Sequence, residues 1–584
     1  MGSILIDKIR IKGFRGLNNI ELSLQDTTVL TGANNVGKTS VLKALQLALG
    51  NRSFLSTDDL NIKSGSRADN IIVDIRIIAI DENNVRTQNF DDDWEAYFTD
   101  KAIKYDNLSL AYVPIRTKFV FNHSRSDFDK QQRILKLWES VDVKWFDIET
   151  TKEKVSLDAL PFFYLEAQRD VVEDLKFKSS YLGRMMSQIS QSYSQDDIEA
   201  LESIIEELNN KAIEKSDILS IIQAVLSGID TTIDNKGSNV TLSPFAKKIR
   251  DLNKTISIQY GENEDSFTME YHGMGTRSWS SLLAFKAFIK HITTLTEKTS
   301  DTPIYPIIAI EEPEAHLHPN AQKKLYHQIQ DINGQKIIST HSPYIVASSN
   351  IYEVRHLYRA TNIQVGHLDK DVLNDDDYRK IKQKVVNTKG EILFSKCIVF
   401  FEGETEEQAL PILAQKYFNV HPAEMGIDFV GVGGAGNYYP FIEFAKRMQI
   451  PWFIFSDGES GPVANMSKAI EKCFGDDFSG LDQCDNVIVI DQGDDFEKYI
   501  IRCDYLSDIK EYIKSQELPK CVNDQHKQKK IKEIEGYTSE YILSESKKNK
   551  TQYALVYANA IARSSKEIPD LFVTLFNRIK NKLS

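Results

Sequence analysis

The sequence predicts an α/β protein of two parts, in each of which short strands alternate with helices. A glycine-rich loop lies between an apolar run and a helical segment in residues 27–50. Short apolar runs with acidic or histidine tips return in residues 304–345, and a third series begins at residue 396. Strands that alternate with helices in this way are typical of parallel sheets.

Length and charge limit the class of protein further. The chain has 584 residues, which exceeds a typical single domain, and a net charge of -13, which argues against indiscriminate binding to nucleic acid. No apolar run approaches the roughly 18 residues of a membrane-spanning helix, and no signal peptide is recognisable. The five cysteines form no C-x-x-C pair, which favours reduced thiols. We therefore expect a cytoplasmic protein without a membrane partner.

The first part opens with strand-like alternation and a glycine-bracketed turn in residues 4–24, followed by the run "TTVLTG". The motif "TGANNVGKTS" comes next and reads G-x-x-x-x-G-K-T. Its glycines would turn backbone N–H groups toward phosphates, Lys38 would reach the β- and γ-phosphates, and Thr39 would hold Mg²⁺. The helix "SVLKALQLALG" follows, and residues 71–80 form another strand candidate. The predicted nucleotide-binding residues of this loop are Gly32, Asn35, Gly37, Lys38, Thr39 and Ser40.

Residues from about 179 to 234 change to a polar helical pattern with apolar positions at i, i+3 and i+4. We predict a helical insertion here, which is either a dimerisation arm or a plain surface hairpin. Just before it, "PFFYLEAQRDV" places Gln168 and Arg169 after an apolar run. Gln168 is a candidate contact to nucleotide-bound Mg²⁺, whereas Arg169 is as well explained as a structural arginine.

Three further segments carry nucleotide chemistry. The strand in "IYPIIAIEEPEAHLHP" ends at Glu311 and Glu312, where one carboxylate can hold Mg²⁺ and the next can orient a water. His341 follows "KIIST" and can either contact a γ-phosphate or cap the strand end. In "YHGMGTRSWSSLLAF" a turn runs into a helix whose first N–H groups, around Gly275 and Ser278, can meet a phosphate.

Together these elements resemble the ABC-type ATPase heads of SMC and RecF-like proteins. The resemblance implies a Walker A loop, a signature helix near residues 273–278, Walker B acids at Glu311 and Glu312, and a switch at His341. It also implies a dimer, because the signature of one protomer completes the site of another. Two features depart from the pattern: Glu311 stands where many relatives have Asp, and "GMGTRS" replaces the usual LSGGQ.

The second part places acids after three predicted strands. Glu402 and Glu406 follow "CIVFF", Asp457 and Glu459 follow "PWFIFS", and "NVIVIDQGDDFEKYI" offers Asp491, Asp494, Asp495 and Glu497. Because parallel strands bring their carboxyl ends to one edge of a sheet, we expect these acids to converge. Carboxylate oxygens suit Mg²⁺ or Mn²⁺, and two such ions can activate water and stabilise the leaving oxygen of a phosphodiester.

Residues 398–497 resemble the Toprim domain of topoisomerases, primases and OLD-family nucleases, with E-G-x-T-E as the sharpest match. The resemblance implies a metal-ligand set of Glu402, Glu406, Asp457, Glu459 and, for the third segment, Glu497. It also implies an assisting lysine in a C-terminal helix, for which we select Lys550 over its neighbours Lys547 and Lys548. The usual D-x-D is Asp-Gly-Glu here.

An ABC-type head followed by a Toprim domain is the architecture of the OLD (overcoming lysogenisation defect) family, which includes Gabija-type and retron-associated nucleases. The resemblance implies an ATPase domain in residues 1–390 with a helical insertion at about 175–240. A Toprim nuclease domain in residues 391–584 would end in helices from about residue 500. The implied function is ATP-regulated, metal-dependent DNA cleavage in anti-phage or anti-plasmid defence. Implied cofactors are ATP and Mg²⁺ or Mn²⁺, and implied partners are DNA, a second copy of the chain, and a helicase or retron components.

Two other functions remain open from the sequence. A Toprim domain can serve a topoisomerase or primase, although no winged-helix tyrosine context or primase zinc module is visible. The chain can also be an ATP-driven sensor or scaffold with a degenerate Toprim domain. The sequence leaves open whether ATP activates or restrains cleavage. Basic segments at residues 526–532, 547–550 and 578–582 would supply phosphate contacts.

Overall fold

The computed structural model describes residues 3–50, 55–63, 65–122, 124–139, 144–177, 179–187, 194–226, 259–260, 267–299, 302–383 and 390–583. The chain divides into two compact units. The first unit comprises Met1–Leu5, Ile78–Val113 and Val155–Lys336, and the second comprises Ile6–Ile77, Pro114–Lys154 and Ile337–Ser584. Four strands run from one unit into the other along the chain: β1 (Ser3–Phe14), β6 (Asn70–Ile80), β8 (Ala111–Asn122) and β14 (Gln335–Ser339).

The first unit contains a parallel strand pair and a long helix. Strand β10 (Phe162–Leu165) pairs in parallel with β13 (Ile307–Glu311). Helix α8 (Met274–Thr299) packs against α3 (Val171–Lys176) and α4 (Tyr181–Ser187), with edge-to-face aromatic contacts that join Phe163, Tyr181 and Phe285. The other elements are α2 (Asp92–Ala102), β7 (Lys104–Tyr105), β11 (Gln259–Tyr260), β12 (Phe267–Thr268), η6 (Met269–Tyr271) and α9 (Pro319–Gln330).

Besides α4, two described helices lie within the predicted insertion, α6 (Gln195–Glu214) and α7 (Asp217–Leu226). Helix α6 begins with a capping box in which Ser194 and Asp197 satisfy each other's backbone N–H groups. Residues 178, 188–193 and 227–240 of the predicted insertion lie outside the described residues. Six apolar side chains of the two helices are exposed: Leu201, Ile204, Leu208, Ile218, Ile221 and Ile222.

The N-terminal part of the second unit confirms the predicted strand, loop and helix order. Strands β1 and β2 (Leu17–Ser23) form an antiparallel hairpin in which Phe14 faces Leu17. Strand β3 (Thr27–Thr31) precedes the glycine-rich loop and α1 (Lys38–Leu49), and it pairs in parallel with β15 (Val354–Arg359). Shorter elements are η1 (Thr57–Asp59), β4 (Ile62–Lys63), β5 (Ser66–Arg67), β9 (Asp127–Ile134), η2 (Trp145–Asp147), α10 (Pro343–Ser348), η7 (Ile351–Glu353), β16 (Ile363–Gly366), α11 (Asp375–Ile381) and η9 (Gly390–Phe394).

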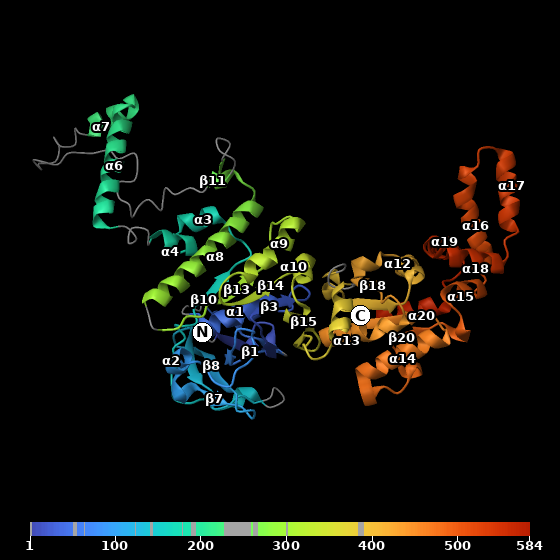
Figure 1. Cartoon of the computed structure of the whole chain (residues 1–584), viewed down its shortest axis with the longest axis horizontal. Coiled ribbons are helices and arrows are strands. Elements are labelled where there is room, and N and C mark those ends of the chain that lie inside the picture. The colour runs from blue at the N-terminus through green and yellow to red at the C-terminus, as the bar shows by residue number, and fades with distance from the viewer. Residues whose placement is uncertain are drawn as a thin grey trace, which may run out of the picture. The chain divides into compact units, whose positions relative to one another are not determined.

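The C-terminal part of the second unit is built on a four-stranded parallel sheet (Figure 1). Its strand order is β18 (Ile427–Gly431), β17 (Cys397–Phe401), β19 (Trp452–Ser456) and β20 (Val487–Val489). Parallel pairing of all four strands brings their carboxyl ends to one edge, as the sequence predicted. Figure 1 shows α12 (Glu404–Phe418), α13 (Tyr438–Met448), α14 (Ser460–Phe474) and α20 (Asp570–Leu583) around this sheet.

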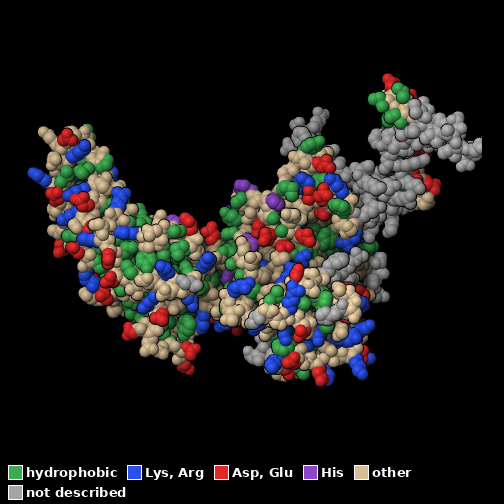
Figure 2. Space-filling view, turned by 180° about the vertical axis from the view of Figure 1, so that it is seen from behind, with side chains coloured by type: hydrophobic (Ala, Val, Ile, Leu, Met, Phe, Trp, Pro, Cys, Tyr) green, Lys and Arg blue, Asp and Glu red, His purple; other side chains and the backbone are tan. Residues whose placement is uncertain are grey.

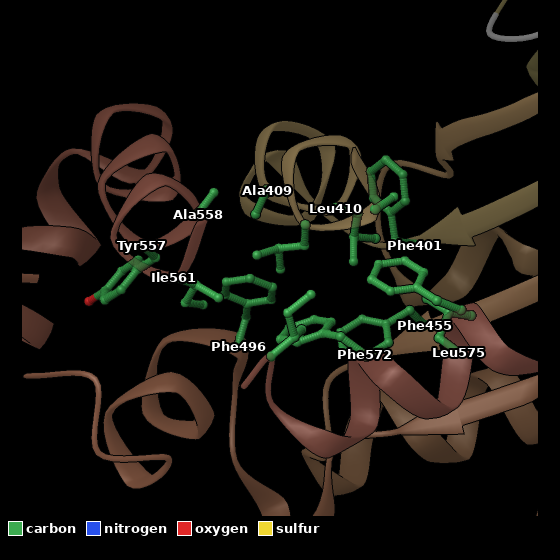
Figure 3. Packing of buried hydrophobic residues seen from close by; sticks show 14 of the residues in the cluster. Phe401, Ala409, Leu410, Phe455, Phe496, Tyr557, Ala558, Ile561, Phe572 and Leu575 are labelled. Carbon is green, nitrogen blue, oxygen red and sulfur yellow. The ribbon is translucent and has the colours of Figure 1, made fainter. Parts of the chain in front are cut away.

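The core of this part lies between the sheet, α12, α20 and a helix from the C-terminal region (Figure 3). Successive residues of a strand point to opposite faces, so Phe401 faces this core whereas Phe400 contacts Phe441 of α13. The ring of Phe572 from α20 stacks on Phe455 with centroids 5.0 Å apart and also contacts Phe496. Buried aromatic area of this kind is a main source of stability.

The last 80 or so residues are helical, which confirms the prediction for this region. Helices α16 (Leu506–Glu517) and α17 (Asp524–Glu535) pack side by side as an arm, and α19 (Lys550–Arg563) packs along α12. The remaining elements are η10 (Pro422–Met425), η11 (Ala435–Asn437), η12 (Gly475–Asp477), η13 (Leu481–Gln483), η14 (Asp491–Gly493), α15 (Phe496–Arg502), η15 (Leu518–Lys520) and α18 (Ser539–Lys548). Among the described helices, none has the length and apolar character needed to cross a membrane.

Candidate functional site

The glycine-rich loop has the backbone that a phosphate site needs. Gly37 is the N-cap of α1 and has a φ of 94°. Gly32 has a φ of 127°, and a Cβ at this position would lie 2.1 Å from the Leu357 carbonyl oxygen. Both positions therefore require glycine. The Lys38 Nζ is buried and donates to the carbonyls of Gly32 (2.8 Å) and Ala33 (2.9 Å). A bound phosphate would compete with these two acceptors for the ammonium group.

Two histidines lie near this loop within the second unit. The Thr340 N–H donates to the Leu30 carbonyl at 3.1 Å, which places His341 beside the end of β3. The His341 ring stacks on Phe394 with centroids 6.4 Å apart. Behind the loop, His356 is buried, its Nδ1 lies 3.4 Å from Thr31 Oγ1, and burial together with the charge of Lys38 lowers its pKa to about 4.

The acids at the end of β13 belong to the first unit. Tyr164 Oη donates to Glu311 Oε2 at 2.5 Å, and Glu312 has a φ of 41°, which is rare outside glycine. Arg169 is buried, and its Nη2 donates to the Pro313 carbonyl at 2.9 Å. Burial lowers the pKa of Arg169 to about 10. Arg169 thus holds the backbone after the strand, which supports its structural interpretation.

Gln168 is exposed and lines a cavity of about 610 Å³ between the loop after β10 and the first turns of α8. Arg277 Nε donates to Asp170 Oδ1 at 2.9 Å and joins this loop to α8. Gly275 approaches the His316 carbonyl so closely that a Cβ would lie 2.6 Å from its oxygen. Ser278 is buried in α8, and its hydroxyl has no hydrogen-bond partner among the described residues.

The acids at the C-terminal edge of the parallel sheet start with Glu402, which directly follows β17. Ser456, the last residue of β19, donates its hydroxyl to Glu402 Oε1 at 2.9 Å. Glu406 lies in the first turn of α12 and is only 4% exposed. The two predicted glutamates therefore lie where β17 runs into α12, and Glu402 is joined to the neighbouring strand.

Asp457 and Glu459 follow β19. Asp457 Oδ1 accepts the backbone N–H of Phe496 at 3.0 Å, while Glu459 is the exposed N-cap residue of α14. A Cβ on Gly458 would lie 1.9 Å from the Ile490 carbonyl oxygen, so the close approach of the two loops requires glycine between these acids. This contact explains the Asp-Gly-Glu sequence in part.

The four acids of the third segment, which follows β20, have different hydrogen-bond and ion-pair partners. Arg502 pairs with both Asp491 and Asp494, and Asp495 caps α15 by accepting the Lys498 N–H at 2.9 Å. Glu497 Oε1 accepts the Thr405 hydroxyl at 3.1 Å, which places it next to the turn into α12. Of the four, Glu497 is therefore the acid that adjoins Glu402 and Glu406 without an arginine partner.

The carboxylates at this edge of the sheet lie close enough together to raise one another's pKa values. Burial and the charges of Glu497 and Glu402 raise the pKa of Glu406 to about 7. Burial and the charges of Glu406, Glu402 and Glu497 raise the pKa of Asp457 to about 8, and burial raises that of Glu402. Carboxylates that raise one another's pKa values lack a nearby positive charge, and a divalent cation would supply one.

The oxygen-only donor set fits Mg²⁺ or Mn²⁺ and does not fit zinc. Within the described ranges, no three His, Cys, Asp or Glu side chains are arranged to hold an ion as they stand. Like charges repel one another when no cation lies between them, so the acids would have to close around an incoming ion.

Lys550, the predicted assisting lysine, is the exposed first residue of α19. The next residue, Thr551, donates to Glu404 Oε2 at 3.2 Å, so this helix start lies beside the turn that carries Glu402. Lys548, in contrast, pairs with Glu545 in α18. The assisting role of Lys550 stays a prediction.

Sequence reasoning missed the hydroxyl groups around these acids. Ser456 and Thr405 hydrogen-bond to Glu402 and Glu497. Tyr438 of α13 is fully buried, and its hydroxyl makes no hydrogen bond of good geometry in the described part of the chain. Ser456 and Thr405 each adjoin a predicted acid in the sequence, which is a usable signal. Tyr438 gives no such signal, because its position depends on how α13 packs.

Comparison with known proteins agrees with this arrangement. Residues 5–346 match the family model AAA_15, described as AAA ATPase domain, and residues 393–458 match the model described as "Overcoming lysogenization defect protein-like, TOPRIM domain". An OLD nuclease of Thermus scotoductus is 24% identical over 79% of this chain and 83% of its own length. Endonuclease GajA of Bacillus cereus strain HuB5-5 is 23% identical over 74% of this chain and 70% of its own.

The match with a solved C-terminal region of the Xanthomonas campestris pv. campestris OLD protein spans 32% of this chain and 97% of that structure's chain. The identity is 19% and the TM-score is 0.25. The predicted fold class is confirmed as an α/β protein with an AAA ATPase domain, helices in the predicted insertion, and an OLD-like Toprim domain with a helical C-terminal region. The chain belongs to the AAA_15 family of AAA ATPase domains and carries an OLD-type Toprim domain after it.

Proposed function

We propose that this chain is an ATP-regulated, divalent-metal-dependent DNA endonuclease or nickase that acts in anti-phage or anti-plasmid defence in the cytoplasm. The observation that carries the proposal is the group of mutually repelling carboxylates, Glu402, Glu406 and Asp457, at the carboxyl ends of two adjacent parallel strands. The nucleases and endonucleases among the relatives support the same chemistry.

In this proposal five acids hold Mg²⁺ or Mn²⁺. The ions, when bound, would activate a water and stabilise the leaving oxygen of a phosphodiester. Ser456 orients Glu402 by its hydrogen bond, and the Phe496 N–H fixes Asp457. Exposed Lys550, whose neighbour Thr551 hydrogen-bonds to Glu404, would contact the DNA phosphate with its ammonium group. The proposed metal ligands are Glu402, Glu406, Asp457, Glu459 and Glu497.

The ATPase part would bind ATP with Mg²⁺ and regulate cleavage. Lys38 would contact the phosphates and Thr39 the ion, while His341, beside the end of β3, would respond to the γ-phosphate. We place the boundary between the ATPase and Toprim domains near residue 390, between the two family matches. In the other unit the proposed roles are Glu311 for Mg²⁺, Glu312 for the attacking water, Gln168 for the ion, and Gly275 and Ser278 for a partner protomer's nucleotide.

We also propose that the chain self-associates and binds DNA. The exposed apolar residues of α6 recur at i, i+3 and i+7 and so share one face, which a second copy of the chain would cover. Exposed Lys529 and Lys532 lie three residues apart on α17. Figure 2 shows lysine and arginine side chains on this arm, interspersed with acidic ones. A helicase or retron components remain proposed partners from the family resemblance alone.

A plasmid-cleavage assay with Mg²⁺ or Mn²⁺ tests the function. Wild type should convert supercoiled plasmid to nicked or linear DNA, and Glu402→Gln should lose at least 100-fold in rate because it removes a metal ligand. Glu407→Gln, an exposed acid on the same helix, should cut at the wild-type rate. Both variants should bind ATP normally.

Two results would contradict the proposal. Relaxed closed circles without nicked or linear product would indicate a topoisomerase, and absence of any cleavage with tight partner binding would indicate a scaffold. An additional variant, Lys38→Ala, tests regulation: its cleavage rate should be the same with and without ATP, whereas the wild-type rates should differ.

A further inference from the structure

Tyr438 places a buried hydroxyl group in the second unit. It is the first residue of α13 and follows a turn in which Gly433 and Gly434 have φ angles of 75° and 114°. The side chain is 0% exposed, and its hydroxyl makes no hydrogen bond of good geometry to the described residues, although the Ser456 side chain lies close enough to lower the pKa of Tyr438. A buried hydroxyl without a partner is costly, because it has lost water and gained nothing in return. A phenylalanine ring would fill this space without that cost.

The groups near this hydroxyl are Ser456 and the acids of the proposed metal site. Helix α13 packs against β17 and β19, whose ends carry Glu402 and Asp457. The Gly434 N–H donates to the Glu402 carbonyl at 3.1 Å and ties the start of this turn to the end of β17. Besides burial, the charges of Glu402, Glu406 and Asp457 raise the pKa of Tyr438. The hydroxyl is therefore a neutral donor that faces negative acceptors.

We propose that Tyr438 is a positioning residue of the acidic site, whose hydroxyl donates to the Glu402 carboxylate when a divalent cation is bound there. Ser456 already donates to Oε1 of this carboxylate, so a second donor would fix the plane of the group. A neutral O–H group orients a carboxylate without cancelling its charge, whereas a lysine at this position would compete with the cation.

This inference rests on the proposed function, and calorimetric titration of the metal-free full chain with Mn²⁺ tests it. The Mn²⁺ ions that wild type binds and Glu402→Gln does not bind are assigned to the acidic site. Tyr438→Phe should bind those ions about 10-fold more weakly than wild type, as is typical when a hydrogen-bond partner of a metal ligand is removed. The same variant without metal should unfold at the wild-type temperature or above it, because it buries no unpartnered hydroxyl.

Tyr439→Phe is the matched control. Its hydroxyl donates to the Val372 carbonyl at 3.4 Å, away from the acids, so this variant should keep the wild-type Mn²⁺ affinity. Unchanged affinity in Tyr438→Phe would overturn the inference, and so would weaker binding accompanied by a lower metal-free unfolding temperature, which indicates a structural role. If wild type and Glu402→Gln take up Mn²⁺ equally, the proposed metal site itself fails and the role of Tyr438 with it.

Discussion

At the scale of single residues, the acids of the Toprim domain differ in the partners of their carboxylates. Asp491 and Asp494 share Arg502, so a metal ion would have to displace an arginine. Glu406 and Asp457 have no such partner among the described residues. Burial and the negative charges of neighbouring carboxylates raise the pKa values of both. The sequence alone could not separate these acids, because the pairing depends on how α15, which ends at Arg502, lies against Asp491 and Asp494.

His356 gives a prediction at the same scale. Its pKa is about 4 in the folded chain, against about 6.5 when unfolded, so the unfolded chain binds more protons between these values. Stability should therefore fall as the pH is lowered from 7 to 4, by about 3 kcal/mol from this residue.

Urea denaturation at both pH values measures this loss. His356→Gln should lose about 3 kcal/mol less than wild type over the same interval, because glutamine does not titrate. Equal losses in the two proteins would show that His356 is not buried as a neutral ring. The comparison of two chains cancels the titration of the many carboxylates.

At the scale of elements, the apolar runs of the sequence correctly located several strands, two of which precede the acids. The predicted run at residues 71–80 is β6, "CIVFF" is β17, and "PWFIFS" contains β19. Strands that are buried on both faces have continuous apolar sequences, so the sequence shows where each of these strands ends. The side chains that helices bring near those ends could not be predicted. Tyr438 lies there because α13 packs on β17 and β19, and Thr551 hydrogen-bonds to Glu404 from a segment far along the chain.

The helices of the insertion lead to a prediction at this scale. Ile204 and Ile218 are 61% and 71% exposed, on α6 and α7 respectively. If a second copy covers them, Ile204→Glu with Ile218→Glu should shift the protein to monomers, because burying a charge without a partner is costly. Light scattering after gel filtration measures the mass in solution. Glu206→Gln, an exposed polar position of α6, should keep the wild-type mass. An unchanged mass in the double variant would show that these helices form a plain surface hairpin.

At the scale of the whole molecule, the two family matches follow one another along the chain without overlap, at residues 5–346 and 393–458. The order of ATPase and Toprim domains was predictable, since each has a short motif that survives wide divergence. The sign of the ATP effect was not, because it depends on the relative stability of two nucleotide states and not on any one motif.

The most direct test of the central claim is the crystal structure of the full chain with Mn²⁺, with the ions located by their anomalous scattering. The account predicts manganese in contact with Glu402 and Asp457, with metal–oxygen distances of about 2.1 Å. Manganese found elsewhere, with these two carboxylates turned to solvent, would contradict it.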